Sequence, residues 1–159
     1  MKRIILIFVL LLLLVGCSYN NEDTENTKPT NDITNNEEEA EEVKMILKIG
    51  SDVIDVIWYD NASVKDLMNH INNELTIELH EYGNFEQTGL LGFTLVSNDE
   101  RMNVGPGDIV LYNSNQICLY YGNNSWSFTK LGRINLSENK IKELLSTSDK
   151  VTIKLEINK

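Results

Sequence analysis

Three loop clusters hold the side chains best suited to bind a ligand. They run over Glu81–Phe85, Tyr112–Asn115 and Lys130–Arg133. Together they offer aromatic rings, amide donors and acceptors, a hydroxyl and one guanidinium, groups that can hold an extended peptide or a small polar molecule. If the three loops converge, we expect a binding groove formed by Tyr82, Asn84, Tyr112, Ser114, Asn115 and Arg133.

Each of these six residues also has a structural role open to it. The two tyrosines suit packing at the edge of a sheet, and the two asparagines suit turns, where Asn satisfies backbone groups. Ser114 would then be an ordinary turn hydroxyl, and Arg133 would pair with Asp108. The sequence leaves the binding and the structural interpretations open at all six positions.

No pattern of an established catalytic or metal centre is present. The chain lacks a Gly-Xaa-Ser-Xaa-Gly motif and a phosphate-binding glycine loop, and its His and Cys residues are not at metal-ligand spacing. His70 and His80 are expected on a helix and on a strand, as ordinary surface side chains. We therefore name no catalytic residue, metal or cofactor.

The first residues have the pattern of an export signal. Lys2 and Arg3 precede an apolar run over 4–15, which is shorter than the roughly 20 residues of a membrane-spanning helix. The run ends in Leu-Val-Gly-Cys at 14–17, which resembles the lipobox of bacterial lipoproteins. In that family the cysteine thiol receives a diacylglyceryl group and the chain is cleaved just before it. The resemblance implies a signal peptide over 1–16, a lipid on Cys17 and a protein tethered to the extracytoplasmic face of the cell membrane.

Residues 17–42 are expected to be a spacer that follows the lipidated cysteine. Residues 18–42 are rich in Asn, Thr and Glu, and nine Asp and Glu residues stand against the single Lys28. So polar a segment cannot bury enough apolar surface to offset the entropy lost on ordering. We predict a disordered acidic linker before a domain over 43–159. A plain membrane anchor, or an ordinary signal peptide with an unrelated cysteine, is the alternative for the N-terminus.

The charge balance argues against nucleic acid as a partner. The formal net charge is −10, and the 14 basic residues form no run. Binding to phosphate backbones needs clustered Lys and Arg. With the linker set aside the domain is only mildly acidic, so its charge identifies no ligand.

Residues 43–159 have the pattern of a mainly β domain. Runs of β-branched and aromatic residues between turn residues predict about eight strands, over 45–50, 53–58, 75–80, 93–96, 109–112, 116–121, 126–131 and 151–157. Helical spacing predicts two short helices, over 63–72 and 137–145, and the segments 81–90 and 98–107 are predicted to be loops. The connections are too short for parallel strands joined by helices, which favours a closed or nearly closed antiparallel barrel capped by the two helices.

Four landmarks in order resemble the bacterial cyclophilin-like domain family. They are Asp-Asn-Ala-Ser at 60–63, Tyr-Gly-Asn at 82–84, the stretch from Gly107 to Asn115, and Leu-Gly-Arg-Ile at 131–134. The resemblance covers residues 45–157 and implies a cyclophilin-like β-barrel. That family is named for its fold and not for an activity, so the resemblance specifies an architecture first.

Prolyl isomerisation is the activity that this fold suggests. True cyclophilins stabilise the twisted amide with an Arg two residues from a Phe, followed by a Gln-Gly-Gly-like segment and later by Trp and His. Neither Arg101 nor Arg133 has that context, and such an Arg supplies the main electrostatic stabilisation. We therefore expect a non-catalytic binding or interaction domain for a peptide or small polar ligand. A divergent isomerase or chaperone for extracytoplasmic proteins, or a surface-display role, is the alternative.

Overall fold

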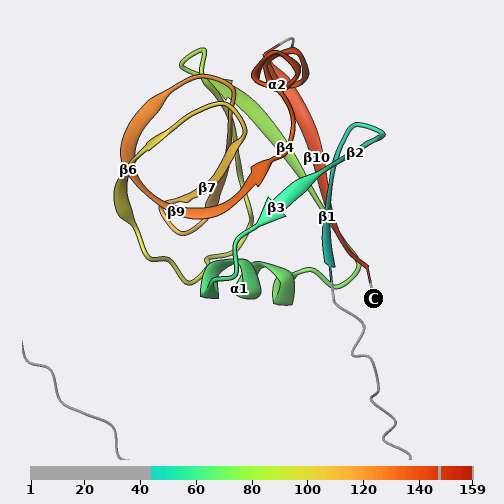
Figure 1. The fold of residues 1–159 in the computed structure, drawn as a ribbon. Helices are drawn as coiled ribbons and strands as arrows, with labels where there is room; N and C mark the ends of the chain where they lie inside the picture. The colour runs from blue at the N-terminus through green and yellow to red at the C-terminus, as the bar shows by residue number, and fades with distance from the viewer. Residues whose placement is uncertain (1–43, 147, 159) are drawn as a thin grey trace, which may run out of the picture. The chain divides into compact units, whose positions relative to one another are not determined.

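Ten strands and two helices make up residues 44–146 and 148–158, the part of the chain that this computed structural model describes (Figure 1). The elements are β1 (Lys44–Ile49), β2 (Asp52–Ile54), β3 (Val56–Trp58), α1 (Ala62–His70), β4 (Glu74–Tyr82), β5 (Glu86–Leu90), β6 (Glu100–Val104), β7 (Asp108–Tyr112), β8 (Gln116–Tyr120), β9 (Asn124–Ile134), α2 (Glu138–Leu145) and β10 (Lys150–Asn158). The signal peptide predicted over 1–16, the lipidation predicted at Cys17 and the linker predicted over 17–42 lie outside the described residues.

Nine of the strands follow one another in the antiparallel order β2-β1-β10-β4-β5-β8-β7-β9-β3. The two edge strands, β2 and β3, are separated in the chain by Asp55 alone. The chain thus passes directly from one edge of the sheet to the other, which nearly closes the sheet into a barrel. The predicted mainly β, antiparallel barrel with two short helices is confirmed. The remaining strand, β6, pairs with the first half of β9, from Glu100↔Phe128 to Val104↔Asn124.

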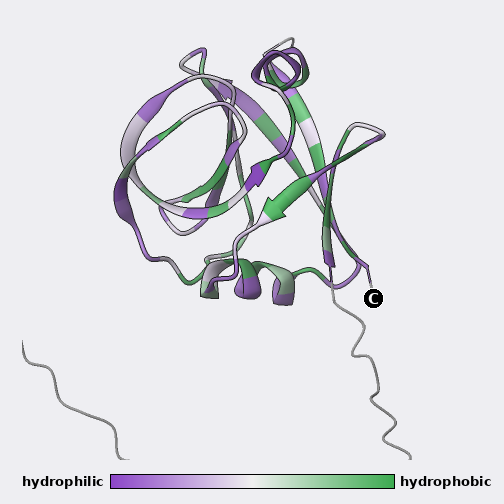
Figure 2. Ribbon diagram, viewed as in Figure 1, coloured by the Kyte–Doolittle hydropathy of each residue, from purple (hydrophilic) through white to green (hydrophobic). Residues whose placement is uncertain are grey.

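The main core lies inside this barrel and consists almost entirely of Leu, Ile and Val side chains. Along β4, Ile77 and Leu79 are buried while Glu78 and His80 are exposed, as the period-two pattern predicts. Figure 2 shows the resulting alternation of hydrophobic and hydrophilic bands along β4 and β10. The two helices lie at opposite ends of the barrel in Figure 1, and each contributes buried aliphatic side chains to the core. Full burial of each such side chain contributes roughly 1.5–3 kcal/mol.

Helix α1 begins one residue earlier than predicted because Asn61 caps it. The side chain of Asn61 accepts a hydrogen bond from the backbone N–H of Val64 at 2.9 Å, which satisfies one of the free donors of the first turn. Ser63, the first residue of the predicted helix, lies inside the observed helix and is buried. Helix α2 begins directly after Ser137 and ends at Leu145, as predicted.

The prediction of loops over 81–90 and 98–107 is wrong, because these segments contain the end of β4 and the strands β5 and β6. Both strands are polar in sequence, Glu-Gln-Thr-Gly-Leu and Glu-Arg-Met-Asn-Val, so neither has the apolar alternation of a half-buried strand. Hydrogen-bonded pairing keeps these segments extended: β5 pairs with β4 and β8, and β6 pairs with β9. The brief extended piece predicted over 93–96 forms no strand.

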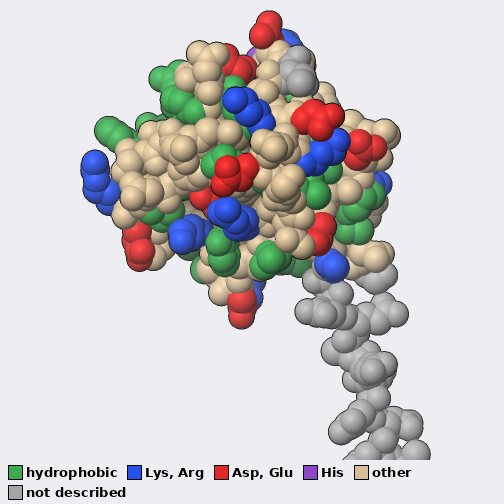
Figure 3. Space-filling model, turned by 45° about the horizontal axis from the view of Figure 1, so that its top comes forward, with side chains coloured by type: hydrophobic (Ala, Val, Ile, Leu, Met, Phe, Trp, Pro, Cys, Tyr) green, Lys and Arg blue, Asp and Glu red, His purple; other side chains and the backbone are tan. Residues whose placement is uncertain are grey.

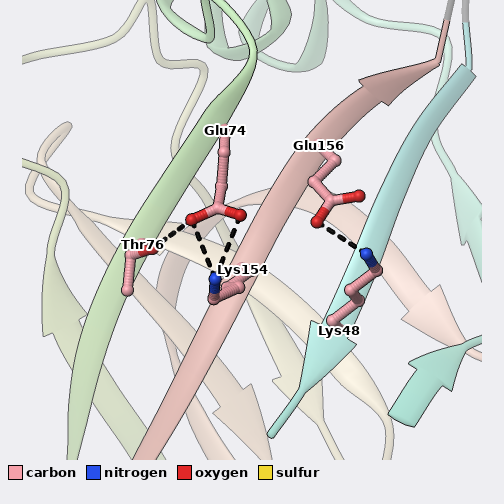
Figure 4. A network of polar contacts seen from close by, with 5 residues as sticks. All are labelled: Lys48, Glu74, Thr76, Lys154 and Glu156. Carbon is pink, nitrogen blue, oxygen red and sulfur yellow. Dashed lines mark hydrogen bonds and ion pairs between the residues drawn. The ribbon is translucent and has the colours of Figure 1, made fainter. Parts of the chain in front are cut away.

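The outer face of β1, β10 and β4 is covered by ion pairs. Lys48 contacts Glu156 at 2.7 Å, and Lys154 contacts Glu74 at 3.0 Å, where Thr76 also donates a hydrogen bond at 2.9 Å (Figure 4). The molecular face drawn in Figure 3 likewise intersperses acidic and basic side chains. The polar groups of this sheet region therefore have partners within the sheet.

Candidate functional site

The strands β5, β8 and β7 carry a second, smaller hydrophobic cluster on the face that points away from the main core. Along β8, Ile117 and Leu119 face the main core, whereas Cys118 and Tyr120 face the other way. This outer cluster is defined by the buried residues Val104, Val110, Cys118, Tyr120 and Phe128. The pair formed by β6 and the first half of β9 supplies Val104 and Phe128, and so covers this face of the barrel.

A cavity of about 500 Å³ opens within this outer cluster, and we call it the aromatic cavity. Six aromatic side chains line it: Tyr82, Phe85, Tyr112, Tyr120, Trp126 and Phe128. The remaining lining comes from Glu86 and from the smaller polar residues Thr88, Gln116, Cys118 and Asn124. Its volume lies within the roughly 300–1,000 Å³ typical of sites for small ligands, and an apolar lining with a few polar groups is typical of them too.

The aromatic rings form a connected series from the surface inward. Tyr82, which is 63% exposed, meets Phe85 edge to face at 6.1 Å, and Phe85 stacks on the buried Tyr120 at 6.1 Å between ring centroids. Phe128 in turn meets Tyr120 at 5.8 Å and Tyr112 at 6.0 Å. Such pairs contribute about 0.5–1.5 kcal/mol beyond the area they bury, so the rings form a preorganised wall.

Phe85 is held in this series by its backbone. Its carbonyl accepts hydrogen bonds from the N–H groups of Tyr121 and Gly122, each at 2.9 Å. Gly83 has a φ of +66°, and a Cβ there would lie 2.3 Å from the Phe85 ring. A Cβ at Gly122 would lie 2.8 Å from the Phe85 Cβ. Only glycine fits at these two turn positions, which explains the Tyr-Gly-Asn-Phe sequence locally.

The carboxyl of Glu86 is the feature of the aromatic cavity with the clearest chemical consequence. The residue is only 7% exposed, and its Oε2 has no hydrogen-bond partner among the described residues. Burial raises the pKa of Glu86 above its usual value, while a smaller hydrogen-bonding contribution from Tyr120 acts in the opposite direction. Glu86 is the one Asp or Glu in the lining, which contains no Lys, Arg or His. The site therefore combines aromatic surface with one buried acidic group that lacks a counter-ion in the lining.

Two further side chains of the aromatic cavity, Cys118 and Tyr120, stay neutral at physiological pH. Burial, with a smaller effect of Glu86, raises the pKa of the Cys118 thiol to about 12 and also raises the pKa of Tyr120. The Cys118 sulfur lies 3.2 Å from the Thr88 hydroxyl, and the Tyr120 hydroxyl accepts a hydrogen bond from Asn124 at 3.3 Å. Because nucleophilic attack needs the thiolate, Cys118 acts here as the buried apolar side chain that its strand position predicts.

The six predicted binding residues do not line one common cavity, so the convergence on which the predicted groove depended is not seen at either of two cavities. Tyr82 and Tyr112 both line the aromatic cavity. Asn84 instead lines a separate cavity of about 330 Å³. Ser114, Asn115 and Arg133 line neither of these two cavities.

Strand pairing explains this separation. The β4–β5 turn and the β7–β8 turn lie at opposite ends of the pair formed by β5 and β8, whose register runs from Glu86↔Tyr120 to Leu90↔Gln116. At about 3.4 Å per residue, five paired positions place the two turns roughly 14 Å or more apart. Arg133 pairs with Asp108, which is the end of β7 remote from Tyr112. The two tyrosines share the cavity because their long side chains extend over the same barrel face.

Three predicted residues make the structural contacts that the sequence also allowed. Arg133 donates to Asp108 at 2.6 Å, and the same carboxylate accepts the Gly105 N–H at 2.8 Å, which fixes the turn into β7. Ser114 adopts a φ of +60° within its turn, and its hydroxyl lies 2.9 Å from that of Ser97. Asn84 also adopts a positive φ, of +58°, and so serves its turn. The side-chain Oδ1 of Asn115 is buried without a partner among the described residues.

Most of the cavity wall comes from residues that are not among the predicted binding residues, above all Glu86, Tyr120 and Phe128. One signal was available in β8, whose run Ile-Cys-Leu-Tyr is apolar at every position instead of at every second one. A strand apolar on both faces is covered on both faces. That pattern predicts a second layer outside the barrel, and the cavity lies in that layer.

Two further findings concern metal ligation and membrane-spanning helices among the described residues. Within 44–146 and 148–158 no group of three or more His, Cys, Asp or Glu side chains is placed to hold a metal ion. In the same residues, neither helix has the length and apolar character needed to cross a bilayer.

Comparison with protein-family models gave a match over most of the domain. The model of a family described as the cyclophilin-like family matches residues 47–156, which is more than half of the chain. No curated protein and no solved structure matches the chain.

Proposed function

The chain belongs to the cyclophilin-like family, and we propose that its barrel is a non-catalytic binding module whose ligand site is the aromatic cavity. The observation that carries this proposal is the meeting of six aromatic side chains and one buried, incompletely paired carboxyl around about 500 Å³ of space. The ligand is a small molecule, or a side chain of a peptide, with an apolar part that fits against the rings.

Such a cavity lowers the stability of the domain, which supports a functional role. A buried polar atom without a partner costs about 1–3 kcal/mol, and an unfilled space loses dispersion contacts with its walls. Filling the space with a larger side chain and replacing Glu86 by an apolar residue would remove both costs. Proteins retain such local costs at sites where they bind ligands or perform chemistry.

The rim of the aromatic cavity suits a partner that arrives from solvent. Tyr82 is 63% exposed and Trp126 is 54% exposed, although both are large aromatic side chains. Tyr82 is the last residue of β4, and Trp126 lies in the first half of β9. Exposed Tyr and Trp beside a pocket are typical of binding surfaces, because each buries a large area with little loss of side-chain freedom.

The non-catalytic part of the proposal is tested by a prolyl isomerase assay on the purified full chain. We expect no acceleration of cis/trans exchange in a proline peptide, because no arginine lies in the lining of the aromatic cavity. Acceleration that Arg133→Ala abolishes would contradict the proposal and favour the isomerase.

We also propose that the module is tethered to the extracytoplasmic face of the cell membrane by a lipid on Cys17. The support is the sequence pattern of residues 1–17: a basic start, a short apolar run and the Leu-Val-Gly-Cys box. Two acyl chains anchor a protein durably, since each buried CH₂ contributes roughly 0.8 kcal/mol. Mass spectrometry of the native N-terminal peptide should find a lipid on Cys17. An unmodified chain that still begins at Met1 in the membrane fraction would refute the anchor.

Ligand binding is tested by NMR with a panel of small aromatic compounds that are cationic, neutral and anionic. We expect saturable shifts confined to residues of the aromatic cavity. Thr88→Tyr, which places a ring in the cavity, should abolish them. Thr76→Tyr is the matched control, because Thr76 is exposed on β4 and does not line the aromatic cavity. If no compound of any charge shifts the cavity residues, the proposed site is refuted.

A further inference from the structure

The aromatic cavity also specifies the chemical class of its ligand, an inference that rests on the proposed binding function. We propose that it binds an organic cation, a protonated amine attached to an apolar body. The ammonium group lies at the carboxyl of Glu86, and the apolar body packs against the aromatic rings.

The charge of the lining is the first argument. Glu86 is its one acidic side chain, and no Lys, Arg or His lines the cavity to neutralise it. Its Oε2 is buried and accepts no hydrogen bond within the described residues. A buried carboxylate without a partner is costly, and an ammonium group supplies both the missing charge and the missing N–H donors. An anionic ligand would instead add a like charge beside Glu86.

The aromatic walls are the second argument. The face of an aromatic ring is electrostatically negative, so it attracts a cation placed within about 6 Å of the ring centre. Phe85, Tyr120 and Phe128 contact one another as a continuous wall, and Tyr120 and Phe128 are almost completely buried. Rings around a lone acidic group form the arrangement that holds ammonium ions attached to apolar groups. A purely apolar ligand would use the rings but would leave the Oε2 atom of Glu86 without a partner.

The protonation of Glu86 makes the inference measurable. Burial raises the pKa of Glu86, so the empty site takes up a proton more readily than an exposed glutamate does. A bound ammonium group favours the ionised carboxylate and displaces that proton. Burial raises the pKa of the Cys118 thiol and of the Tyr120 and Tyr121 phenols, so these three groups carry no charge at pH 7. The remaining titratable side chains of the lining are the phenols of Tyr82 and Tyr112. The affinity for an amine should therefore fall as the pH drops through the pKa of Glu86.

Titration calorimetry of the purified full chain in a nonionic detergent tests the inference. The probes are 2-phenylethylammonium, 2-phenylethanol and 3-phenylpropionate, which share a phenyl body and differ in charge. We expect the ammonium compound to bind at least tenfold more tightly than the alcohol, and the carboxylate to bind most weakly. Lowering the pH to 4 should weaken the ammonium compound at least fivefold and leave the alcohol unchanged.

A matched pair of variants tests whether ammonium binding depends on the Glu86 carboxyl. Glu86→Gln keeps the shape of the side chain and should reduce ammonium binding to the level of the alcohol. Glu143→Gln makes the same charge change on the exposed surface of α2 and should leave binding unchanged. The pH series on the unmodified chain gives an independent measurement if Glu86→Gln does not fold.

The outcomes separate this inference from the proposed function. Equal affinity for the alcohol and the ammonium compound, or full ammonium binding by folded Glu86→Gln, would overturn the cation inference while the cavity remained a ligand site. Failure of all three probes would overturn both. The amine could belong to a small molecule or to a lysine side chain of a protein. A lysine tripeptide with blocked ends, compared with its acetyl-lysine form, distinguishes these two sources. Preference for the unmodified lysine peptide over 2-phenylethylammonium would assign the ammonium group to a protein partner.

Discussion

The two faces of strands β5, β8 and β7 differ in kind. The inner face packs Leu, Ile and Val side chains into a core that the two helices close, whereas the outer face packs aromatic rings around a cavity that contains a buried carboxyl. Adjacent residues of one strand, Leu119 and Cys118, thus belong to different environments. The difference indicates that the inner face supplies the stability of the domain and that the outer face is free to carry a binding site.

The first prediction tests this division with two variants that shorten neighbouring side chains of β8. Leu119→Ala should lower the free energy of unfolding by about 3 kcal/mol, because it leaves a hole in a closed aliphatic core. Cys118→Ala should cost only about 1 kcal/mol, since the side chain is smaller and already borders a cavity. Urea unfolding of both variants measures the two costs. Equal costs would show that the outer cluster is as important for stability as the core.

The sequence predicts the inner face well and the outer face poorly, for a physical reason. Period-two alternation and helical spacing report which residues face one common core, so β4, β10 and both helices are confirmed close to their predicted bounds. The strand β6 has almost no apolar pattern, and its pairing with β9 is a long-range contact that local sequence does not encode. Trp126 and Phe128 of the paired part of β9 line the cavity, whereas of the predicted binding residues only Tyr82 and Tyr112 do.

The second prediction concerns the outer face and tests whether its buried carboxyl lowers the stability of the domain. Glu86→Gln should raise the free energy of unfolding by about 1 kcal/mol at pH 8, because a neutral amide is cheaper to bury than a carboxylate without a counter-ion. The pKa of Glu86 is raised in the folded protein. The folded state therefore holds the proton more tightly than the unfolded chain, and the wild type loses stability as the pH rises through that pKa. At pH 4 the two proteins should differ little.

Urea unfolding at pH 4, 6 and 8 measures this difference, with Glu143→Gln as the control that removes an exposed carboxylate of α2. If Glu86→Gln unfolds at a higher free energy and also loses amine binding, the carboxyl that binds the ligand lowers the stability of the domain. The opposite pH trend, with the gain largest at pH 4, would mean that the Glu86 carboxylate is stabilised in the folded protein and that the cavity is not a site for cations.

The third prediction concerns a surface region whose charged side chains pair with one another. Lys48→Gln breaks the contact with Glu156 on the outer face of β1 and β10 (Figure 4). Both side chains are partly exposed, and exposed ion pairs contribute about 0–1 kcal/mol that salt screens further. We expect a loss below about 0.5 kcal/mol, smaller again in 1 M NaCl, by urea unfolding at the two salt concentrations. A loss above that of Cys118→Ala would contradict the division, because it would make this polar face more important for stability than the outer cluster.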